Sequence, residues 1–222
     1  MEHSRNRAIS IQGRIVVFDY GEVISVEPSV SDRAEIVQLA GIPAEAFWPA
    51  YWRQRTAFDH GTVSATQYWE AIEREVGASW AAGRRYELWL ADFRSWLAID
   101  RDTLEVILDL ERGGTRMAML SNAAREFASY YRHGMLGDLF EQVFTSSELG
   151  FLKPQPEIFE AVVTVLGARP AEIVFIDNLE SNVRGAEAVG ITAHHYTDAV
   201  ELRAYLERLS EAGVPYSEVR QS

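Results

Sequence analysis

The chain has 222 residues, of which 47% are hydrophobic and 24% charged, a composition typical of a folded globular protein rather than a disordered one. It has no cysteine, which excludes disulfides, thiolate catalysis and cysteine metal ligands. A net charge of −12 argues against a broad basic surface for nucleic acid, and no apolar run approaches the ~20 residues that a membrane-spanning helix needs. We therefore expect a cytoplasmic protein without nucleic-acid or membrane partners.

Residues 1–13 are polar and charged without an apolar segment, which predicts a loose N-terminal tail. Short apolar runs then recur at wide spacing, as the buried strands of a parallel sheet do. These predicted strands are Ile15–Phe18, Met117–Leu120, Val143–Phe144, Ile173–Ile176 and Ile191–Ala193. Between the later runs, three helical patterns stop at glycine: Asp102–Arg112, Pro156–Leu166 and Leu179–Val189. The alternation predicts an α/β fold, a doubly wound parallel sheet with helices on both faces.

Residues 25–97 interrupt this alternation, because they contain only helical patterns. We expect them to form an inserted α-helical cap domain, with 14–24 and 98–222 forming the core domain. Ser64 and Gln67 fit a capping box at a helix start. All six tryptophans lie within 48–96, and we interpret the aromatic residues of this segment as the core of a small helical bundle rather than as the lining of a substrate pocket.

Polar side chains follow the strands of the predicted sheet. Asp19 ends the first strand, Ser121 and Asn122 follow the second, and Asp177 and Asn178 follow the fourth. In open α/β sheets, ligands bind at this carboxyl edge.

Lys153, in the segment ELGFLKPQPEIFE after the third strand, is the only lysine among 21 basic residues. A lone lysine in a chain that otherwise uses arginine indicates a position that needs a compact point charge.

The order of a carboxylate, a hydroxyl, a lysine and a second carboxylate resembles the four motifs of the haloacid dehalogenase (HAD) superfamily. The motifs FDYGEV, MLSNA, LGFLKP and FIDNxxxN are most similar to those of capped phosphatases whose first motif is FDxGxV. The resemblance implies a Rossmann-like sheet of order 5-4-1-2-3 and a phosphomonoesterase that acts on a small phosphorylated metabolite, such as a sugar phosphate, through an aspartyl phosphate.

The same resemblance assigns expected roles. Asp19 is the nucleophile and acts with Ser121 and Lys153 as catalytic residues. Ser121, Asn122 and Lys153 bind the phosphate. The cofactor is Mg²⁺, and its expected ligands are Asp19, Gly21, Asp177 and Asn178.

Two positions depart from the commoner family pattern. Gly21 stands where a second aspartate usually serves as general acid and base, and Asn178 stands where a second acid usually binds the metal. Substitutes for the missing acid are Glu22, Asp59 and His60, each of which also reads as an ordinary turn or surface residue. A 2-haloacid dehalogenase-like hydrolase is the first alternative, and a catalytically weakened binding or regulatory protein is the second.

Overall fold

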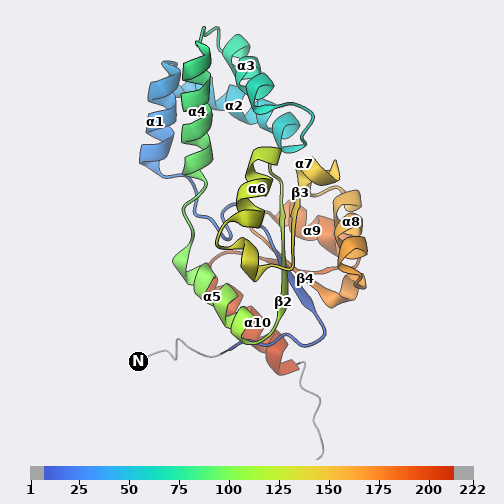
Figure 1. The fold of residues 1–222 in the computed structure, drawn as a ribbon. Coiled ribbons are helices and arrows are strands. Elements are labelled where there is room, and N and C mark those ends of the chain that lie inside the picture. The colour runs from blue at the N-terminus through green and yellow to red at the C-terminus, as the bar shows by residue number, and fades with distance from the viewer. Residues whose placement is uncertain (1–7, 213–222) are drawn as a thin grey trace, which may run out of the picture.

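The computed structural model describes residues 8–212, so the ends of the expected tail (1–7) and core (213–222) lie outside the described residues. The core contains a parallel sheet of five strands in the order β3-β2-β1-β4-β5. This is the predicted order 5-4-1-2-3 read from the other edge, and it confirms the doubly wound α/β fold (Figure 1). The strands are β1 (Ile15–Phe18), β2 (Arg116–Ser121), β3 (Gln142–Thr145), β4 (Ile173–Asp177) and β5 (Thr192–His195).

Helices cover both faces of the sheet, because alternate side chains of each strand point to opposite faces. Val16 and Phe18 of β1 belong to one hydrophobic cluster with helices α5 (Arg101–Arg112) and α10 (Ala199–Ala212). Ile15 and Val17 belong to a second cluster with α8 (Pro156–Leu166) and α9 (Glu180–Ala188). The core helices are α5 (Arg101–Arg112), α6 (Arg125–His133), α7 (Ser146–Leu149), α8 (Pro156–Leu166), α9 (Glu180–Ala188) and α10 (Ala199–Ala212), with two short 3-10 helices, η1 (Gly137–Leu139) and η2 (Pro170–Glu172).

The four helices of the insert form a separate cap above the carboxyl edge of the sheet (Figure 1). The expected capping box is present at α3: the Ser64 hydroxyl accepts from the Gln67 N–H at 3.3 Å, and the Gln67 side chain accepts from the Ser64 N–H at 2.9 Å. The chain enters and leaves the cap side by side, at a bridge between Ser25 and Ile99, which supports the proposed limits of the insert at 25 and 97. The cap helices are α1 (Val30–Ala40), α2 (Ala44–Asp59), α3 (Ala65–Glu75) and α4 (Ala82–Ser95).

The tryptophans of the cap serve two purposes, which corrects the expectation that they only fill its core. Trp69 is buried among the cap helices, as expected. Trp48, Trp52 and Trp96 line cavities that they share with Glu22 of the loop after β1, although Trp48 and Trp96 also pack against the core, and Trp52 is 54% exposed. The helical spacing of aromatic residues does not distinguish the two cases, because both place rings on one helix face.

Residues 8–13 also differ from the expected loose tail. Ile9 and Ile11 are buried in the core, 2% and 4% exposed. Thr115 holds them there: its hydroxyl donates to the Ile9 carbonyl at 3.0 Å and accepts from the Ile11 N–H at 2.9 Å. This short segment is stabilised by burying two isoleucines while its backbone polar groups stay paired.

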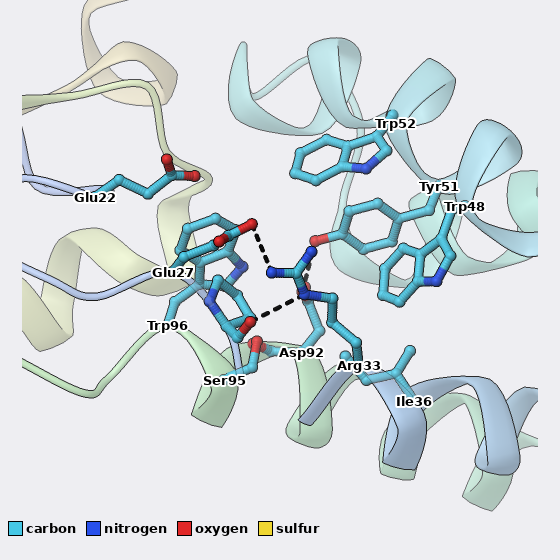
Figure 2. A pocket seen from close by; sticks show the side chains of 11 residues that line it. Glu22, Glu27, Arg33, Ile36, Trp48, Tyr51, Trp52, Asp92, Ser95 and Trp96 are labelled. Carbon is cyan, nitrogen blue, oxygen red and sulfur yellow. Dashed lines mark hydrogen bonds and ion pairs between the residues drawn. The ribbon is translucent and has the colours of Figure 1, made fainter. Parts of the chain in front are cut away.

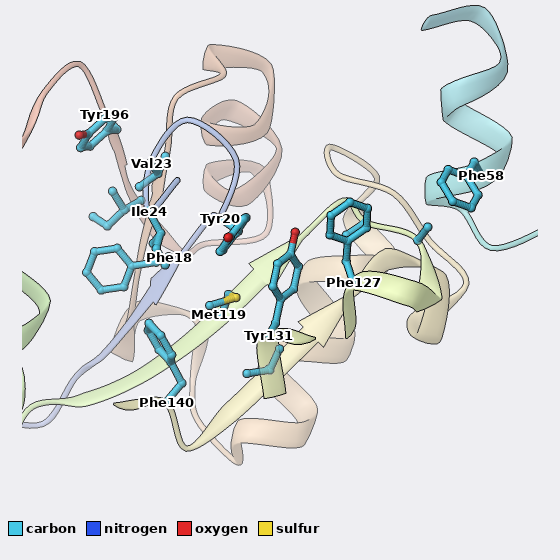
Figure 3. Close-up of a cluster of buried hydrophobic side chains, with 14 of the residues drawn as sticks. Phe18, Tyr20, Val23, Ile24, Phe58, Met119, Phe127, Tyr131, Phe140 and Tyr196 are labelled. Atoms are coloured by element: carbon cyan, nitrogen blue, oxygen red, sulfur yellow. The ribbon is translucent and has the colours of Figure 1, made fainter. Parts of the chain in front are cut away.

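The hydrophobic core continues to the carboxyl edge, where aromatic rings support the loop after β1 (Figure 3). Phe18 contacts Phe140 edge to face, with ring centroids 6.4 Å apart. Tyr20 packs on Tyr131 of α6, with centroids 4.1 Å apart. The Tyr20 hydroxyl donates to the carbonyl of Trp96 at 3.0 Å, so the loop that follows Asp19 is tied directly to the end of the cap.

Candidate active site

The ends of β1, β2 and β4 place their polar residues side by side. Phe18 is in register with Met119 on one side and Ile176 on the other, so Asp19 lies level with Leu120 and Asp177. The Asp19 N–H continues the ladder by donating to the Ile176 carbonyl at 2.8 Å. Asp19 is 7% exposed and lines a cavity of about 210 Å³ between core and cap.

Lys153 lies at the centre of this site, although it comes from the loop before α8. Its buried ammonium contacts Asp19 Oδ1 and Asp177 Oδ2, each at 2.7 Å, and donates to the Leu120 carbonyl at 3.0 Å. These three acceptors use all three ammonium protons. One compact cation therefore holds both carboxylates. This agrees with the prediction that the only lysine of the chain marks a position that needs a compact point charge.

Asn122 has a role that the sequence did not indicate. Its side-chain Oδ1 accepts from the Lys153 backbone N–H at 2.9 Å, and its Nδ2 donates to the Lys153 carbonyl at 3.0 Å. The side chain therefore clamps the backbone of Lys153, and the Asn122 backbone N–H stays available for the expected phosphate contact. Ser121 is buried at the end of β2 and lines the same cavity.

Asp177 is completely buried, and protein donors occupy both of its carboxylate oxygens. Oδ1 accepts from the Leu179 N–H at 2.8 Å, Oδ2 accepts from Lys153, and the Asn182 amide donates to both at 3.0 Å. By contrast, Oδ2 of Asp19 has no hydrogen-bond partner within residues 8–212. Asp19 is thus the carboxylate of the pair that is free to react.

This arrangement agrees with a comparison to known families, in which residues 14–190 match the model of the haloacid dehalogenase-like hydrolases. The chain belongs to this family.

Its relatives include phosphatases of different substrates. The hydrolase is 24% identical to a sesquiterpene phosphatase of Aspergillus oryzae, over 88% of this chain and 96% of that protein. It is 25% identical to a D-ribitol-5-phosphate phosphatase of Bacteroides thetaiotaomicron, over 86% of this chain and 95% of that protein. Its fold matches that of a solved HAD family enzyme from the same bacterium in a magnesium complex, with a TM-score of 0.68, 21% identity, and coverage of 94% and 98% of the two chains.

Burial sets the charge states of the site. It raises the pKa of Asp19 to about 7, and the Lys153 ammonium opposes this shift. Burial by itself lowers the pKa of Lys153, but the carboxylates of Asp19 and Asp177 reverse the shift and raise it above its ordinary value. The lysine of the hydrolase therefore stays charged, and its charge favours the ionised form of Asp19.

The cap contributes an ion pair to the same cavity. Arg55 and Asp59, one turn apart on α2, both line the cavity, with 2.8 Å between Arg55 Nε and Asp59 Oδ1. Arg55 also donates to the Tyr51 hydroxyl at 2.5 Å and lies 3.5 Å from Asp92 of α4. The sequence does not single out Arg55, because an arginine four residues before an aspartate is typical of an ordinary surface pair on a helix. Asp59 was named from the sequence only as one of several substitute acids.

The end of α2 is docked on the core next to this pair. The Ser146 hydroxyl donates to the Asp59 carbonyl at 2.5 Å. Gly61 has a positive φ of 78°, and a Cβ at this position would lie 2.8 Å from Ser147 Cβ. The close approach of α2 to α7 thus holds Asp59 over the carboxyl edge. His60, another substitute acid, does not line the cavity.

The oxygen atoms near Asp19 suit a magnesium ion. Within residues 8–212, no three His, Asp or Glu side chains form a metal-binding cluster. Mg²⁺ needs no such cluster, since it is commonly bound by one or two carboxylates, with substrate phosphate and water as the remaining ligands. Gly21 and Asn178 line the cavity beside Asp19, and Glu22 Oε2 accepts from Asn178 Nδ2 at 3.3 Å. This hydrogen bond uses the amide nitrogen of Asn178, so its amide oxygen is free to coordinate a metal.

The expected ligand Asp177 fits less directly. Its oxygens are fully occupied, so coordination would require it to exchange one of its protein hydrogen bonds.

None of the helices within the described part of the chain is both long and apolar enough to cross a membrane.

Proposed function

We propose that the hydrolase is a Mg²⁺-dependent phosphomonoesterase of a small phosphorylated metabolite, with Asp19 as the nucleophile. The observation that carries this proposal is the asymmetry of the two buried carboxylates: Lys153 and Asn182 engage Asp177 fully, whereas Asp19 presents a free Oδ2 to the cavity. Phosphatases among the relatives that align over most of their length support it. A cytoplasmic location stays a prediction.

In the first proposed step, Oδ2 of Asp19 attacks phosphorus and the bond from phosphorus to the ester oxygen breaks. Lys153 compensates the charge shared by Asp19 and the phosphoryl group, while the Ser121 hydroxyl and the Asn122 N–H bind phosphoryl oxygens. Bound Mg²⁺ would supply further positive charge to those oxygens, held by Asp19, the Gly21 carbonyl and Asn178. Asp177 would orient the Lys153 ammonium through their ion pair.

The leaving oxygen needs a proton, and Gly21 has no acidic side chain to supply one. We propose Asp59 as the donor, because it is the carboxyl of the cap that lines the cavity beside Arg55, and burial raises its pKa to about 6. In the second step, Asp59 as a carboxylate accepts the proton of a water molecule that attacks the phosphorus of the aspartyl phosphate. Inorganic phosphate leaves and Asp19 is regenerated.

The test is phosphate release from an aryl phosphate, with and without Mg²⁺, by wild type and the Asp19→Asn variant. We expect Mg²⁺-dependent release by the wild type and none by the variant. A halide-release assay on a 2-haloacid runs beside it, because a dehalogenase would use Asp19 on carbon. Halide release without phosphate release overturns the proposal, as does equal phosphate release by both proteins.

A further inference from the structure

The cap contains a second cavity, of about 130 Å³, next to the candidate active site. Trp48, Tyr51 and Trp52 of α2 form one wall, and Trp96 forms the opposite wall (Figure 2). Ile36 of α1 closes one end. The lining is therefore mainly aromatic and apolar.

The two cavities adjoin each other. Glu22, Trp52 and Trp96 line both of them. Trp96 packs against the loop of the nucleophile: a Cβ on Gly21 would lie 3.9 Å from its ring. The shared residues place the aromatic cavity next to the cavity that contains Asp19, on its cap side.

The charged groups of the aromatic cavity are already paired within the protein. Arg33 contacts Glu27 at 2.5 Å and donates to the Pro28 carbonyl at 2.9 Å (Figure 2). Asp92 accepts from the Tyr51 hydroxyl at 2.6 Å. Hydroxyl groups of a bound sugar would therefore compete with existing pairs. The Arg55 guanidinium lies over the Trp96 ring, 5.9 Å from its centroid, whereas Trp52 is 54% exposed and can contact carbon.

We propose, on the basis of the phosphatase function above, that the substrate is a phosphate monoester of an apolar, planar alcohol whose carbon portion lies in this aromatic cavity. The volume sets its size, because an apolar cavity of about 150 Å³ holds one benzene ring. A ring or a branched unit of about six carbons fits beyond the ester oxygen. Trp52 is the residue that determines this specificity, because it lines both cavities and is 54% exposed.

The experiment compares kcat/KM for three phosphates in the presence of Mg²⁺: benzyl phosphate, ribitol 5-phosphate and acetyl phosphate. Acetyl phosphate reports on the phosphate site, since its acyl group is too short to fill the aromatic cavity. We expect benzyl phosphate to exceed ribitol 5-phosphate by at least about tenfold, the scale of discrimination in an apolar pocket. Trp52→Ala should lower the ratio of benzyl to acetyl phosphate by about fivefold or more, as a lost apolar contact does.

Tyr86→Ala is the matched control, because Tyr86 is a 60% exposed cap aromatic outside both cavities. It should leave the ratio unchanged. If acetyl phosphate is hydrolysed but ribitol 5-phosphate equals or exceeds benzyl phosphate, or if Trp52→Ala affects all three alike, the substrate class is overturned while the phosphatase function stands.

Binding supplies a second readout that needs no turnover. Benzylphosphonate, whose carbon–phosphorus bond is not hydrolysed, is titrated calorimetrically into wild type, Trp52→Ala and Tyr86→Ala. Binding that weakens only in Trp52→Ala supports the apolar cavity even if no phosphate is released, an outcome that would overturn the phosphatase function alone. Equal binding to all three proteins, or none to the wild type, overturns the proposed substrate class.

Discussion

The side-chain amide of Asn122 holds the backbone of Lys153 from both sides, accepting from its N–H at 2.9 Å and donating to its carbonyl at 3.0 Å. The two residues are 31 positions apart in the sequence. The clamp fixes where the lysine side chain starts, and the ammonium then reaches Asp19 and Asp177 at 2.7 Å each. The Asn122 side chain thus positions the cation that lies between the two carboxylates.

Asn122→Ala should lower kcat by about tenfold or more, because a displacement of the lysine costs transition-state stabilisation of ~1.4 kcal/mol per decade. Loss of two hydrogen bonds should also lower the free energy of unfolding by about 1–3 kcal/mol. Asn122→Asp keeps the acceptor for the Lys153 N–H and should recover part of both losses. Steady-state kinetics and urea unfolding measure them. Wild-type kcat in the alanine variant contradicts the positioning role.

Lys153→Arg should lower kcat/KM by at least about tenfold, since a planar guanidinium cannot replace a compact ammonium among three acceptors. Lys153 is only 5% exposed, so the larger side chain should also destabilise the fold. Kinetics therefore have to be measured well below the unfolding temperature. The reverse exchange, Arg184→Lys on the exposed surface, is the control and should change neither quantity. Full turnover by Lys153→Arg would show that the lone lysine has no special role.

Asn178→Asp should tighten Mg²⁺ binding about five- to hundredfold, because a carboxylate near a dication adds about 1–3 kcal/mol even when screened. Calorimetric titration of Mg²⁺ measures the affinity without turnover. Glu22 lies 3.3 Å from the Asn178 amide, so the new carboxylate would face a second acid. Adding Glu22→Gln removes that repulsion in the metal-free protein. An unchanged Mg²⁺ affinity in Asn178→Asp would place residue 178 outside the coordination sphere.

Burial raises the pKa of Asp19 to about 7, so the assay uses saturating Mg²⁺, whose charge favours the ionised nucleophile. Under these conditions, hydrolysis of an alkyl phosphate should decline as the pH rises above about 6, the value to which burial raises the pKa of Asp59. Asp59 donates a proton in the proposed step, and it holds that proton only below its pKa. The charged groups around it are Arg55, which lowers this pKa, Asp92, which raises it, and the pair of Asp19 and Lys153 in the same cavity.

Asp59→Asn isolates this effect from the other titrations. It should remove the decline near pH 6 and lower the rate on the alkyl ester below that pH by ~10²-fold or more, as loss of a general acid does. An aryl phosphate should be affected much less, because its leaving group needs no proton. Profiles of kcat/KM against pH for both esters and both proteins give the result. The same decline in Asp59→Asn would assign it to another group.

The chain's own order of residues determined the sheet and the carboxylate pair. Buried parallel strands appear as apolar runs, and their carboxyl ends converge on one edge whatever the details of packing. The sequence alone therefore places Asp19, Ser121 and Asp177 together, and the single lysine among arginines indicates the cation between them.

Tertiary structure alone decided what the cap contributes. Whether Trp52 fills a core or lines a cavity, and whether Asp59 is a surface acid or lies over Asp19, depends on how α2 is oriented against the core. That orientation rests on contacts such as Ser146 with Asp59, which are 87 residues apart. Helical periodicity specifies which residues share a face of α2, but long-range packing specifies what that face meets.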